Sequence, residues 1–243
     1  MDSGSCRWLL LHGTPLRPRV WDGVVAILGA DGQVRCPDSA PHADDAGGSR
    51  SVQARIAERI VDEELGVGLP DDAPVRVVGH SFGGQVAIEV ALAALDRITS
   101  LTLVCSRDTP FPAFVATARA LRDGVAVDLE ASMRRWFRPD ELAAGGTVVQ
   151  ETRESLAAAD RTAWATALTA IAGYDRAGEV GRIGVPVTLI AAGRDEVSTP
   201  AAMAALAERL PDATLTVLPD AAHMSPFLDP VGLAHLVAGG ATR

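Results

Sequence analysis

The sequence predicts an α/β fold, with a mostly parallel, doubly wound sheet and a helical segment inserted between two of its strands. Short apolar runs without polar alternation are typical of strands that are buried on both faces of a parallel sheet. Helical patterns separate these runs, and alternating strands and helices indicate a parallel α/β sheet. One long interval, residues 107–182, carries helical patterns but no good strand.

Six segments predict the strands, four of them strongly apolar and two weaker. The strong segments are residues 8–11, 75–78, 101–104 and 187–191, and the weaker ones are residues 33–36 and 214–218. Helices are predicted over residues 52–65, where apolar residues recur at helical spacing, and over residues 81–95, which are apolar almost all round. Thr199 and Pro200 give a capping residue and a first-turn proline for a third helix.

The long helical interval divides the chain. We expect residues 1–106 and 183–243 to form one α/β core, and residues 107–182 to form a helical cap inserted into it. Glycine and proline residues split the inserted segment into several short helices, because both residues interrupt a helical pattern.

One predicted cap helix carries an apolar stripe. Its members recur at helical spacing and are Leu129, Met133, Trp136 and Phe137. The stripe either lines an acyl or ring pocket or packs the cap on the core. Three arginines flank it, namely Arg134, Arg135 and Arg138. They can receive a substrate carboxylate, but a solvated helix face is the favoured interpretation.

Composition excludes several classes of protein. The chain has 243 residues, a net charge of −9 and 22 basic residues that are all arginine. An acidic balance without a basic run argues against nucleic-acid or anionic-membrane partners. No window approaches the roughly 20 apolar residues that a membrane-spanning helix requires. The composition therefore favours a globular protein with a small-molecule partner, and it leaves the oligomeric state open.

Cysteine usage predicts a cytoplasmic location. Cys6, Cys36 and Cys105 are odd in number and form no C-x-x-C pair, which fits a reduced compartment better than a disulfide framework. The apolar run at residues 8–11 is too short for a secretory signal.

Ser81 is the candidate nucleophile. It lies in Gly79-His80-Ser81-Phe82-Gly83, a G-x-S-x-G pattern directly between a predicted strand and an apolar helix. Such a turn holds the serine in a strained backbone and exposes its hydroxyl, while the flanking glycines avoid Cβ collisions. The helix N-terminus adds N–H groups for a developing oxyanion. The alternative is a glycine-rich turn in which Ser81 only caps the helix.

His223 is the candidate base among the five histidines. It follows the last predicted strand, and the carboxyl ends of the strands are where a parallel sheet places its site. His80 adjoins Ser81, but neighbours across a tight turn rarely face each other usefully. His235 lies in an apolar stretch typical of a helix surface or core. A structural loop histidine remains the alternative for His223.

Asp195 is the candidate carboxylate that would orient the base and stabilise its imidazolium. It follows the predicted strand over residues 187–191, so it also lies at a carboxyl end of the sheet. Glu196 is its direct neighbour, and Asp108 follows another strand, so both remain competitors for the same role.

The segment after the first strand, Leu11-His12-Gly13-Thr14-Pro15, offers a second oxyanion donor. We assign the main-chain N–H of Thr14 to this role, beside that of Phe82. His12 is expected to bond the loop rather than to transfer protons. A simple strand-terminating turn is the alternative.

Together, the segments LLLHGTPL, VVGHSFGGQVA, AAGRDEVSTP and DAAHMSPFLDP resemble the α/β-hydrolase superfamily. The last segment is most similar to small esterases, cofactor-free haloperoxidase-type enzymes and enol-lactonases. The chain order Ser81, Asp195, His223 is that of the family's triad. The resemblance implies a cap after the family's sixth strand, where residues 107–182 fall. It also implies a sheet that begins at the family's third strand, without the usual first hairpin.

The resemblance implies an acyl-enzyme mechanism. Ser81 would attack an acyl carbonyl, His223 would carry the proton, and Asp195 would orient His223. The N–H groups of Thr14 and Phe82 would hold the oxyanion, and water would then hydrolyse the acyl-enzyme. The leading hypothesis is therefore a serine hydrolase of a small-molecule ester or lactone.

Two further hypotheses remain open. The fold supports lyase, perhydrolase and cyclisation chemistry as well, because a fold does not determine a function. A small-ligand binding protein with a slow triad is the third hypothesis. No cofactor is expected, because no dinucleotide or phosphate-binding glycine pattern occurs. No metal is expected either, because His42, Asp44 and Asp45 lack a further ligand set.

Overall fold

The computed structural model describes residues 6–30, 32–42, 45, 49–65 and 75–239. They form an α/β fold around a six-stranded sheet in the order β2-β1-β3-β4-β5-β6, in which every neighbouring pair is parallel. The strands are β1 Cys6–Leu11, β2 Gly32–Arg35, β3 Val75–His80, β4 Ile98–Val104, β5 Val187–Ala192 and β6 Ala213–Leu218. Each predicted strand coincides with one of these, so the predicted parallel sheet is confirmed.

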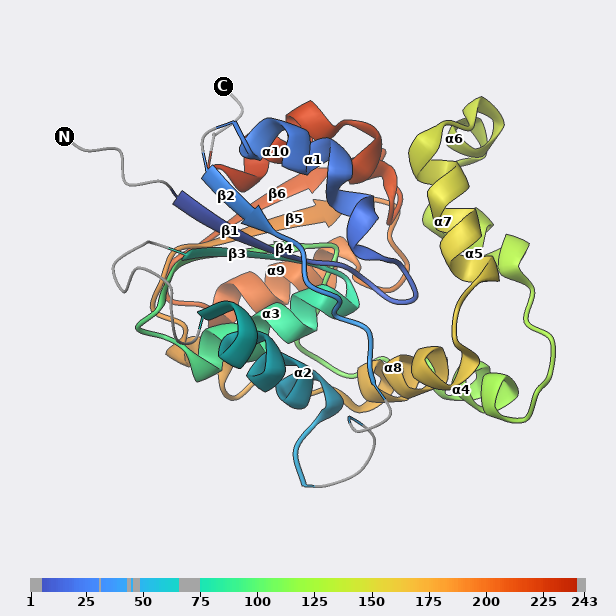
Figure 1. The fold of residues 1–243 in the computed structure, drawn as a ribbon, viewed down its shortest axis with the longest axis horizontal. Helices are drawn as coiled ribbons and strands as arrows, with labels where there is room; N and C mark the ends of the chain where they lie inside the picture. The colour runs from blue at the N-terminus through green and yellow to red at the C-terminus, as the bar shows by residue number, and fades with distance from the viewer. Residues whose placement is uncertain (1–5, 31, 43–44, 46–48, 66–74, 240–243) are drawn as a thin grey trace.

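Helices cover both faces of the sheet (Figure 1). On one face lie α1 (Asp22–Leu28) and α10 (Pro230–Val237), and on the other lie α2 (Val52–Ile60), α3 (Phe82–Ala93) and α9 (Pro200–Arg209). From β1 the chain runs out to the edge strand β2 and then returns to β3 on the other side of β1. Because the strand order reverses there, the carboxyl ends of β1 and β3 flank the crevice in which such sheets place their sites.

Two of the predicted helices begin at a capping hydroxyl, and Thr199 is the cap that the sequence predicts. The hydroxyls of Ser51 and Thr199 accept hydrogen bonds from the N–H groups three residues on, at 3.1 and 3.2 Å. The α2 helix continues as a π-helical turn, Val61–Leu65, so the helix predicted over residues 52–65 is confirmed. The α3 helix is buried on every side over residues 82–91, which explains its continuous apolar sequence.

Five α-helices, one 3₁₀ helix and no strand lie between β4 and β5, a stretch that the structure describes throughout. The α-helices are α4 Phe114–Arg122, α5 Leu129–Trp136, α6 Pro139–Ala144, α7 Thr147–Ala157 and α8 Arg161–Gly173. Figure 1 shows α5, α6 and α7 beyond the carboxyl ends of β5 and β6, and α4 packs against α8. The role of residues 107–182 as a cap remains a prediction.

The remaining described elements are short 3₁₀ helices over Pro18–Trp21, Val180–Arg182 and Ser225–Leu228. The Ser225–Leu228 turn connects the loop after β6 to α10, and Phe227 in it is buried. Among the described helices, none is long and apolar enough to cross a membrane.

A buried ion pair ties the loop after β4 to α9. Asp108 has no exposed surface, and its carboxylate oxygens accept hydrogen bonds from Arg209 Nη2 at 2.7 Å and from Arg209 Nε at 2.9 Å. The main-chain oxygen of Asp108 also accepts a hydrogen bond from Arg176 N–H at 2.8 Å. Guanidinium and carboxylate groups match each other closely in this bidentate geometry. Asp108 therefore belongs to the packing of the core.

Replacing Asp108 with Asn should lower the free energy of unfolding, because the Arg209 guanidinium would lose its counter-ion. The side chain of Arg209 is 29% exposed, which limits the penalty. We expect a loss of about 2–3 kcal/mol in urea unfolding, below the full cost of breaking a buried pair. The control is Asp123→Asn, which removes a surface pair with Arg119 and should cost under about 0.5 kcal/mol. Equal losses in the two variants would contradict this account.

Candidate active site

Ser81 occupies the sharp turn between β3 and α3. Its φ of 54° and ψ of −119° are rare for a residue with a side chain, and such strain costs about 1–3 kcal/mol. The surrounding main chain holds it there. Ser81 N–H donates to Val104 O at 3.0 Å, and Ser81 O accepts a hydrogen bond from Ser106 Oγ at 2.8 Å. The strained strand-to-helix turn predicted from the sequence is therefore confirmed.

Glycine is required on both sides of this turn. A Cβ atom at Gly79 would lie 2.3 Å from Gly83 O, and one at Gly83 would lie 2.4 Å from both Leu11 O and His12 O. No side chain fits at such distances, so the G-x-S-x-G pattern reflects close backbone packing. The second of these contacts brings the loop after β1 directly against the Ser81 turn.

His223 and Asp195 meet at the carboxyl ends of β5 and β6. His223 Nδ1–H donates to Asp195 Oδ2 at 2.6 Å. The other oxygen, Asp195 Oδ1, accepts hydrogen bonds from Val197 N–H at 2.8 Å and Ser198 N–H at 3.1 Å. With Nδ1 engaged, a neutral His223 keeps Nε2 as a proton acceptor.

The Asp195 carboxylate is charged although it is only 4% exposed. Burial alone would raise its pKa, but the neighbouring His223 and the two backbone N–H donors outweigh burial and lower the pKa below its ordinary value. A buried, fixed anion beside Nδ1 is the arrangement that stabilises an imidazolium.

A close approach of two loops makes this pair possible. A Cβ at Gly193 would lie 2.1 Å from Pro219 O, and Arg194 N–H donates to Ala221 O at 2.9 Å. The loop after β5, which carries Asp195, is thus joined to the loop after β6, which carries His223.

The structure also separates the other sequence candidates from this pair. Glu196 is exposed, and Asp108 is committed to Arg209. His235 lies on the exposed surface of α10. His42 N–H donates to Asp45 Oδ2 at 2.7 Å, an ordinary loop contact, and Asp44 lies outside the described residues.

Ser81 and His223 line one small cavity. Its volume is about 30 Å³, and its walls are mostly aromatic and aliphatic side chains. The residues lining it are Thr14, Ser81, Phe114, Thr117, Arg135, Trp136, Trp164, Leu168, Ile171, Val197 and His223. No hydrogen bond joins Ser81 Oγ to His223 in the described part of the chain. Such contacts commonly tighten only when substrate is bound.

Only part of the predicted cap stripe reaches this cavity. Trp136 lines it, whereas Met133 and Phe137 are buried in the packing of the molecule. Sequence reasoning missed the contributions of α4 and α8, including Phe114 and Trp164. Their spacing carries no signal that separates a cavity wall from ordinary core.

A second, larger cavity of about 850 Å³ lies between α2, α3 and α8. Most of the residues that line it are polar or charged by type, and none of Ser81, Asp195 and His223 lines it. We assign the candidate site to the smaller cavity, because the nucleophile, the base and the strained turn meet there.

Thr14 lies in the loop after β1, which runs beside the Ser81 turn. A Cβ at Gly13 would lie 3.0 Å from Ser81 Cβ, so the loop passes close to the turn. His12 fixes this loop, because its ring nitrogens Nδ1 and Nε2 lie 2.9 Å from Gly13 O and 3.0 Å from Asp38 Oδ1, respectively. The expected structural role of His12 is therefore confirmed.

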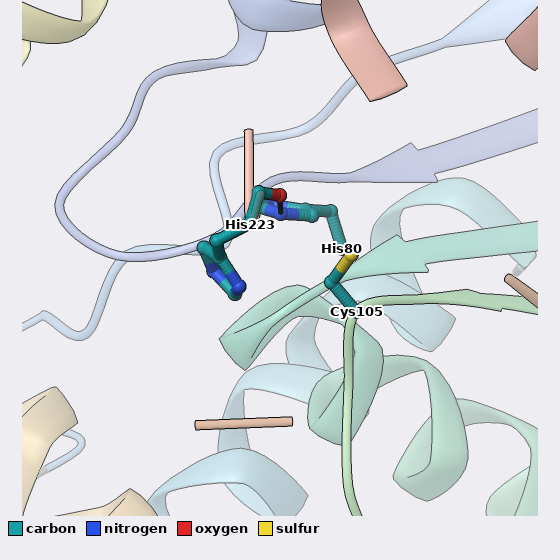
Figure 2. A group of neighbouring side chains, drawn as sticks. All are labelled: His80, Cys105 and His223. Atoms are coloured by element: carbon teal, nitrogen blue, oxygen red, sulfur yellow. Dashed lines mark hydrogen bonds between the residues drawn. The ribbon is translucent and has the colours of Figure 1, made fainter. Parts of the chain in front are cut away.

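His80, which the sequence does not predict to act in the site, lies directly beside the candidate base His223 (Figure 2). Its Nε2–H donates to the main-chain oxygen of His223 at 3.3 Å, and the two rings are 4.7 Å apart. The rings of His80 and Phe227 also pack edge to face, with their centroids 4.9 Å apart. Burial lowers the pKa of His80 well below its ordinary value, so the ring is neutral. No sequence signal marks this contact, because the two histidines are far apart in the chain.

His80, Cys105 and His223 also bring three metal-ligating atoms within 4.8 Å of one another (Figure 2). Their chemistry does not favour a metal. Each histidine has only one ring nitrogen left for a metal, because Asp195 engages His223 Nδ1 and a carbonyl engages His80 Nε2. Burial raises the pKa of the Cys105 thiol well above its ordinary value, and metals bind the thiolate. We interpret these three side chains as buried packing beneath the site rather than as a metal centre.

Comparison with known proteins identifies relatives over most of the chain. A model of the alpha/beta hydrolase family matches residues 8–236. The pimeloyl-[acyl-carrier protein] methyl ester esterase of Nitrosomonas europaea is 30% identical over 238 residues, which cover 90% of this chain and 89% of that protein. The 3-oxoadipate enol-lactonase 2 of Acinetobacter baylyi is 30% identical over 162 residues, covering 65% of this chain and 60% of that one.

Solved structures share the fold at lower identity. The enol-lactonase from Burkholderia xenovorans gives a TM-score of 0.83 at 23% identity, with 100% of this chain and 94% of that chain covered. A thermophilic esterase from Thermogutta terrifontis gives a TM-score of 0.81 at 22% identity, with 97% of this chain and 89% of that chain covered.

The contact between His12 and Asp38 predicts a pH-dependent contribution to stability. The hydrogen bond to His12 is the main reason that the pKa of Asp38 falls from 3.8 to about 2. A lowered folded-state pKa stabilises the protein above the unfolded value, and the gain is lost as the pH falls from 3.8 towards 2. Asp38→Asn should therefore cost up to about 1 kcal/mol near neutral pH, since the carboxylate is half-exposed, and almost nothing near pH 2. Urea unfolding across this range tests it, and a pH-independent difference would contradict it.

Proposed function

This chain belongs to the alpha/beta hydrolase family, and we propose that it is a serine hydrolase that cleaves a small-molecule ester or lactone through an acyl-enzyme. The observation that carries the proposal is the 2.6 Å hydrogen bond from His223 to Asp195, with His223 and Ser81 on one cavity. The relatives named as methyl ester esterases and as an enol-lactonase support this class of substrate.

In this proposal Ser81 is the nucleophile. Its Oγ forms a bond to the acyl carbon while its proton passes to His223 Nε2 and the carbonyl π electrons move onto oxygen. Nδ1 is already engaged by Asp195, so Nε2 is the nitrogen left to take the proton. The buried Asp195 anion stabilises the imidazolium that forms and fixes the orientation of the ring.

Main-chain N–H groups of Phe82 and Thr14 would stabilise the oxyanion. Phe82 is the first residue of α3, where N–H groups have no partner within the helix and the positive end of the helix dipole lies. Thr14 lines the same cavity from the other side of the Ser81 turn. Donors that are fixed before the reaction lower its barrier, because they need no reorganisation as charge develops.

Collapse of the tetrahedral intermediate breaks the bond to the alcohol oxygen, which takes the proton back from His223. A water molecule then attacks the acyl-enzyme with His223 again as base. The acid leaves, and the proton returns to Ser81 Oγ. One ester and one water thus give one acid and one alcohol, and the two products of a lactone stay joined.

We further propose that residues 107–182 are a cap that moves to admit substrate. A cavity of about 30 Å³ holds a water molecule or two, whereas small-molecule sites measure about 300–1,000 Å³. Phe114, Trp136 and Trp164 line it from α4, α5 and α8. Displacement of these helices would enlarge the space over Ser81.

The proposed setting is the cytoplasm, with a small-molecule ester or lactone as the partner. The odd number of cysteines supports a reduced compartment, and Cys36 and Cys105 are free thiols. The acidic net charge of −9 argues against a nucleic-acid partner.

Ser81→Ala should leave the fold intact and lower turnover by about 10⁴-fold or more, because the attacking atom is removed. A panel of short and long p-nitrophenyl esters and simple lactones tests it, with the variant measured beside the native protein. Activity that persists in Ser81→Ala would contradict the proposal. A folded protein without turnover on the whole panel would favour non-hydrolytic chemistry or ligand binding instead.

Asp195→Asn should lower kcat by about 10⁴-fold, because an amide cannot stabilise the imidazolium and favours the wrong tautomer of His223. The matched control is Glu196→Gln, which changes the neighbouring exposed carboxylate in the same way. Its kcat should stay within about twofold of the native value. A larger loss in Glu196→Gln than in Asp195→Asn would reverse the assignment.

A further inference from the structure

We propose that Arg135 binds an anionic group of the substrate, so that the preferred esters carry a negative charge remote from the ester bond that is cleaved. This inference rests on the proposed hydrolase function and adds the substrate class to it. It arises from the charge pattern around the small cavity that contains Ser81 and His223.

The lining of the cavity changes from apolar inside to cationic at its edge. Trp136, Trp164, Leu168, Ile171 and Val197 are each less than 9% exposed, and they surround the candidate catalytic groups. Arg135 is the one exposed residue in this lining, and its guanidinium is the one permanent cation there. A substrate with an apolar portion near Ser81 and an anion towards the solvent would match this gradient.

Three neighbouring arginines, on α5, on α7 and at the start of α6, are already paired with carboxylates. Arg134 donates to Asp128 at 3.1 Å, and Arg153 donates to Glu130 at 3.0 Å. Arg138 pairs with Asp140 and Glu141 at its own helix start.

Arg135 has no such partner among the described residues. Its one hydrogen bond goes from Nη2 to Ser132 Oγ at 3.4 Å, which is long for a charged donor. A guanidinium offers five donors. Most of them therefore remain available to a ligand, whereas carboxylates neutralise Arg134, Arg138 and Arg153.

The position of Arg135 on α5 does not by itself explain why Arg134 has a carboxylate partner and Arg135 does not. Cations in the last turn of a helix are stabilised by the helix dipole, but Arg134 and Arg135 share that turn equally. The two residues differ in direction, since successive residues on a helix are rotated by about 100°. Arg134 turns to Asp128 and the solvent, and Arg135 turns to the cavity.

A carboxylate is the simplest anion for this site, because guanidinium groups bind carboxylates and phosphates through paired hydrogen bonds. The anion can belong to the acyl part or to the alcohol part of the ester. In both cases the substrate is an ester with a remote negative charge. Esters that carry the charge on the acyl part and esters that carry it on the alcohol part distinguish the two cases.

The test compares each carboxylate ester with its carboxamide, which is neutral and nearly the same shape. One pair carries the group at the end of the acyl chain, and the other carries it on the alcohol. The native protein, Arg135→Gln and Arg134→Gln are measured at low salt, with Ser81→Ala as the blank. For one pair, we expect the native kcat/KM to favour the carboxylate by about tenfold or more, mainly through KM. That ratio should fall about tenfold in Arg135→Gln, persist in Arg134→Gln, and weaken with added salt.

Two results would overturn the proposal. One is a native protein that shows no preference for the carboxylate in either pair. The other is a preference that survives in Arg135→Gln or disappears equally in Arg134→Gln.

A binding measurement separates this inference from the hydrolase proposal. Calorimetry on Ser81→Ala and on the double variant with Arg135→Gln gives the affinity for each uncleaved carboxylate and carboxamide ester. If no ester shows Ser81-dependent turnover, the hydrolase proposal fails. The loss or persistence of carboxylate preference in binding still decides the role of Arg135.

Discussion

The candidate site depends on how closely backbone segments approach one another around Ser81. The carbonyl groups of Leu11 and His12 would lie 2.4 Å from a Cβ at Gly83, and Ser81 Cβ would lie 3.0 Å from one at Gly13. A single methyl group at Gly83 would push the loop after β1 away from the start of α3. Thr14 and Phe82, the proposed oxyanion donors, lie on these two segments, so the packing sets the distance between them. The strain stored at Ser81 is tolerated for the same reason, since the surrounding hydrogen bonds leave the turn no alternative.

The same tight packing extends from the Ser81 turn to the base. His80 connects them, because it precedes Ser81 in sequence and donates to the main-chain oxygen of His223. The loop after β5 also fixes the loop that carries His223. Gly193 allows Pro219 to approach closely, and Asp195 accepts the hydrogen bond from the His223 imidazole. The result is one connected set of loops at the carboxyl ends of β1, β3, β5 and β6. Rigid loops of this kind hold reacting groups in fixed positions.

The inserted helices touch this set of loops directly. Met224 N–H, next to the candidate base, donates to Trp136 O at the end of α5 at 2.9 Å. Trp136 is also the neighbour of Arg135, so one turn of α5 carries a cavity wall, the proposed anion-binding group and a bond to the loop of His223. Any movement of α5 that enlarges the cavity must therefore either break this hydrogen bond or carry the loop with it. If the two proposals hold, this one helix turn would couple the binding of the substrate anion to the position of His223.

The sequence by itself determined the parallel sheet, the nucleophile turn and the order of the candidate residues. Buried strands require continuous apolar runs, and a tight turn requires glycine at fixed positions, so both leave a local signal. Only the tertiary structure decided between Asp195, Glu196 and Asp108, because one loop approach brings Asp195 to His223 and an ion pair takes Asp108 to Arg209. Only the tertiary structure likewise shows that Arg135, and not Arg134, lines the cavity, and that His80 contacts His223. Direction on a helix and contact between distant segments are set by packing, which no short stretch of sequence encodes.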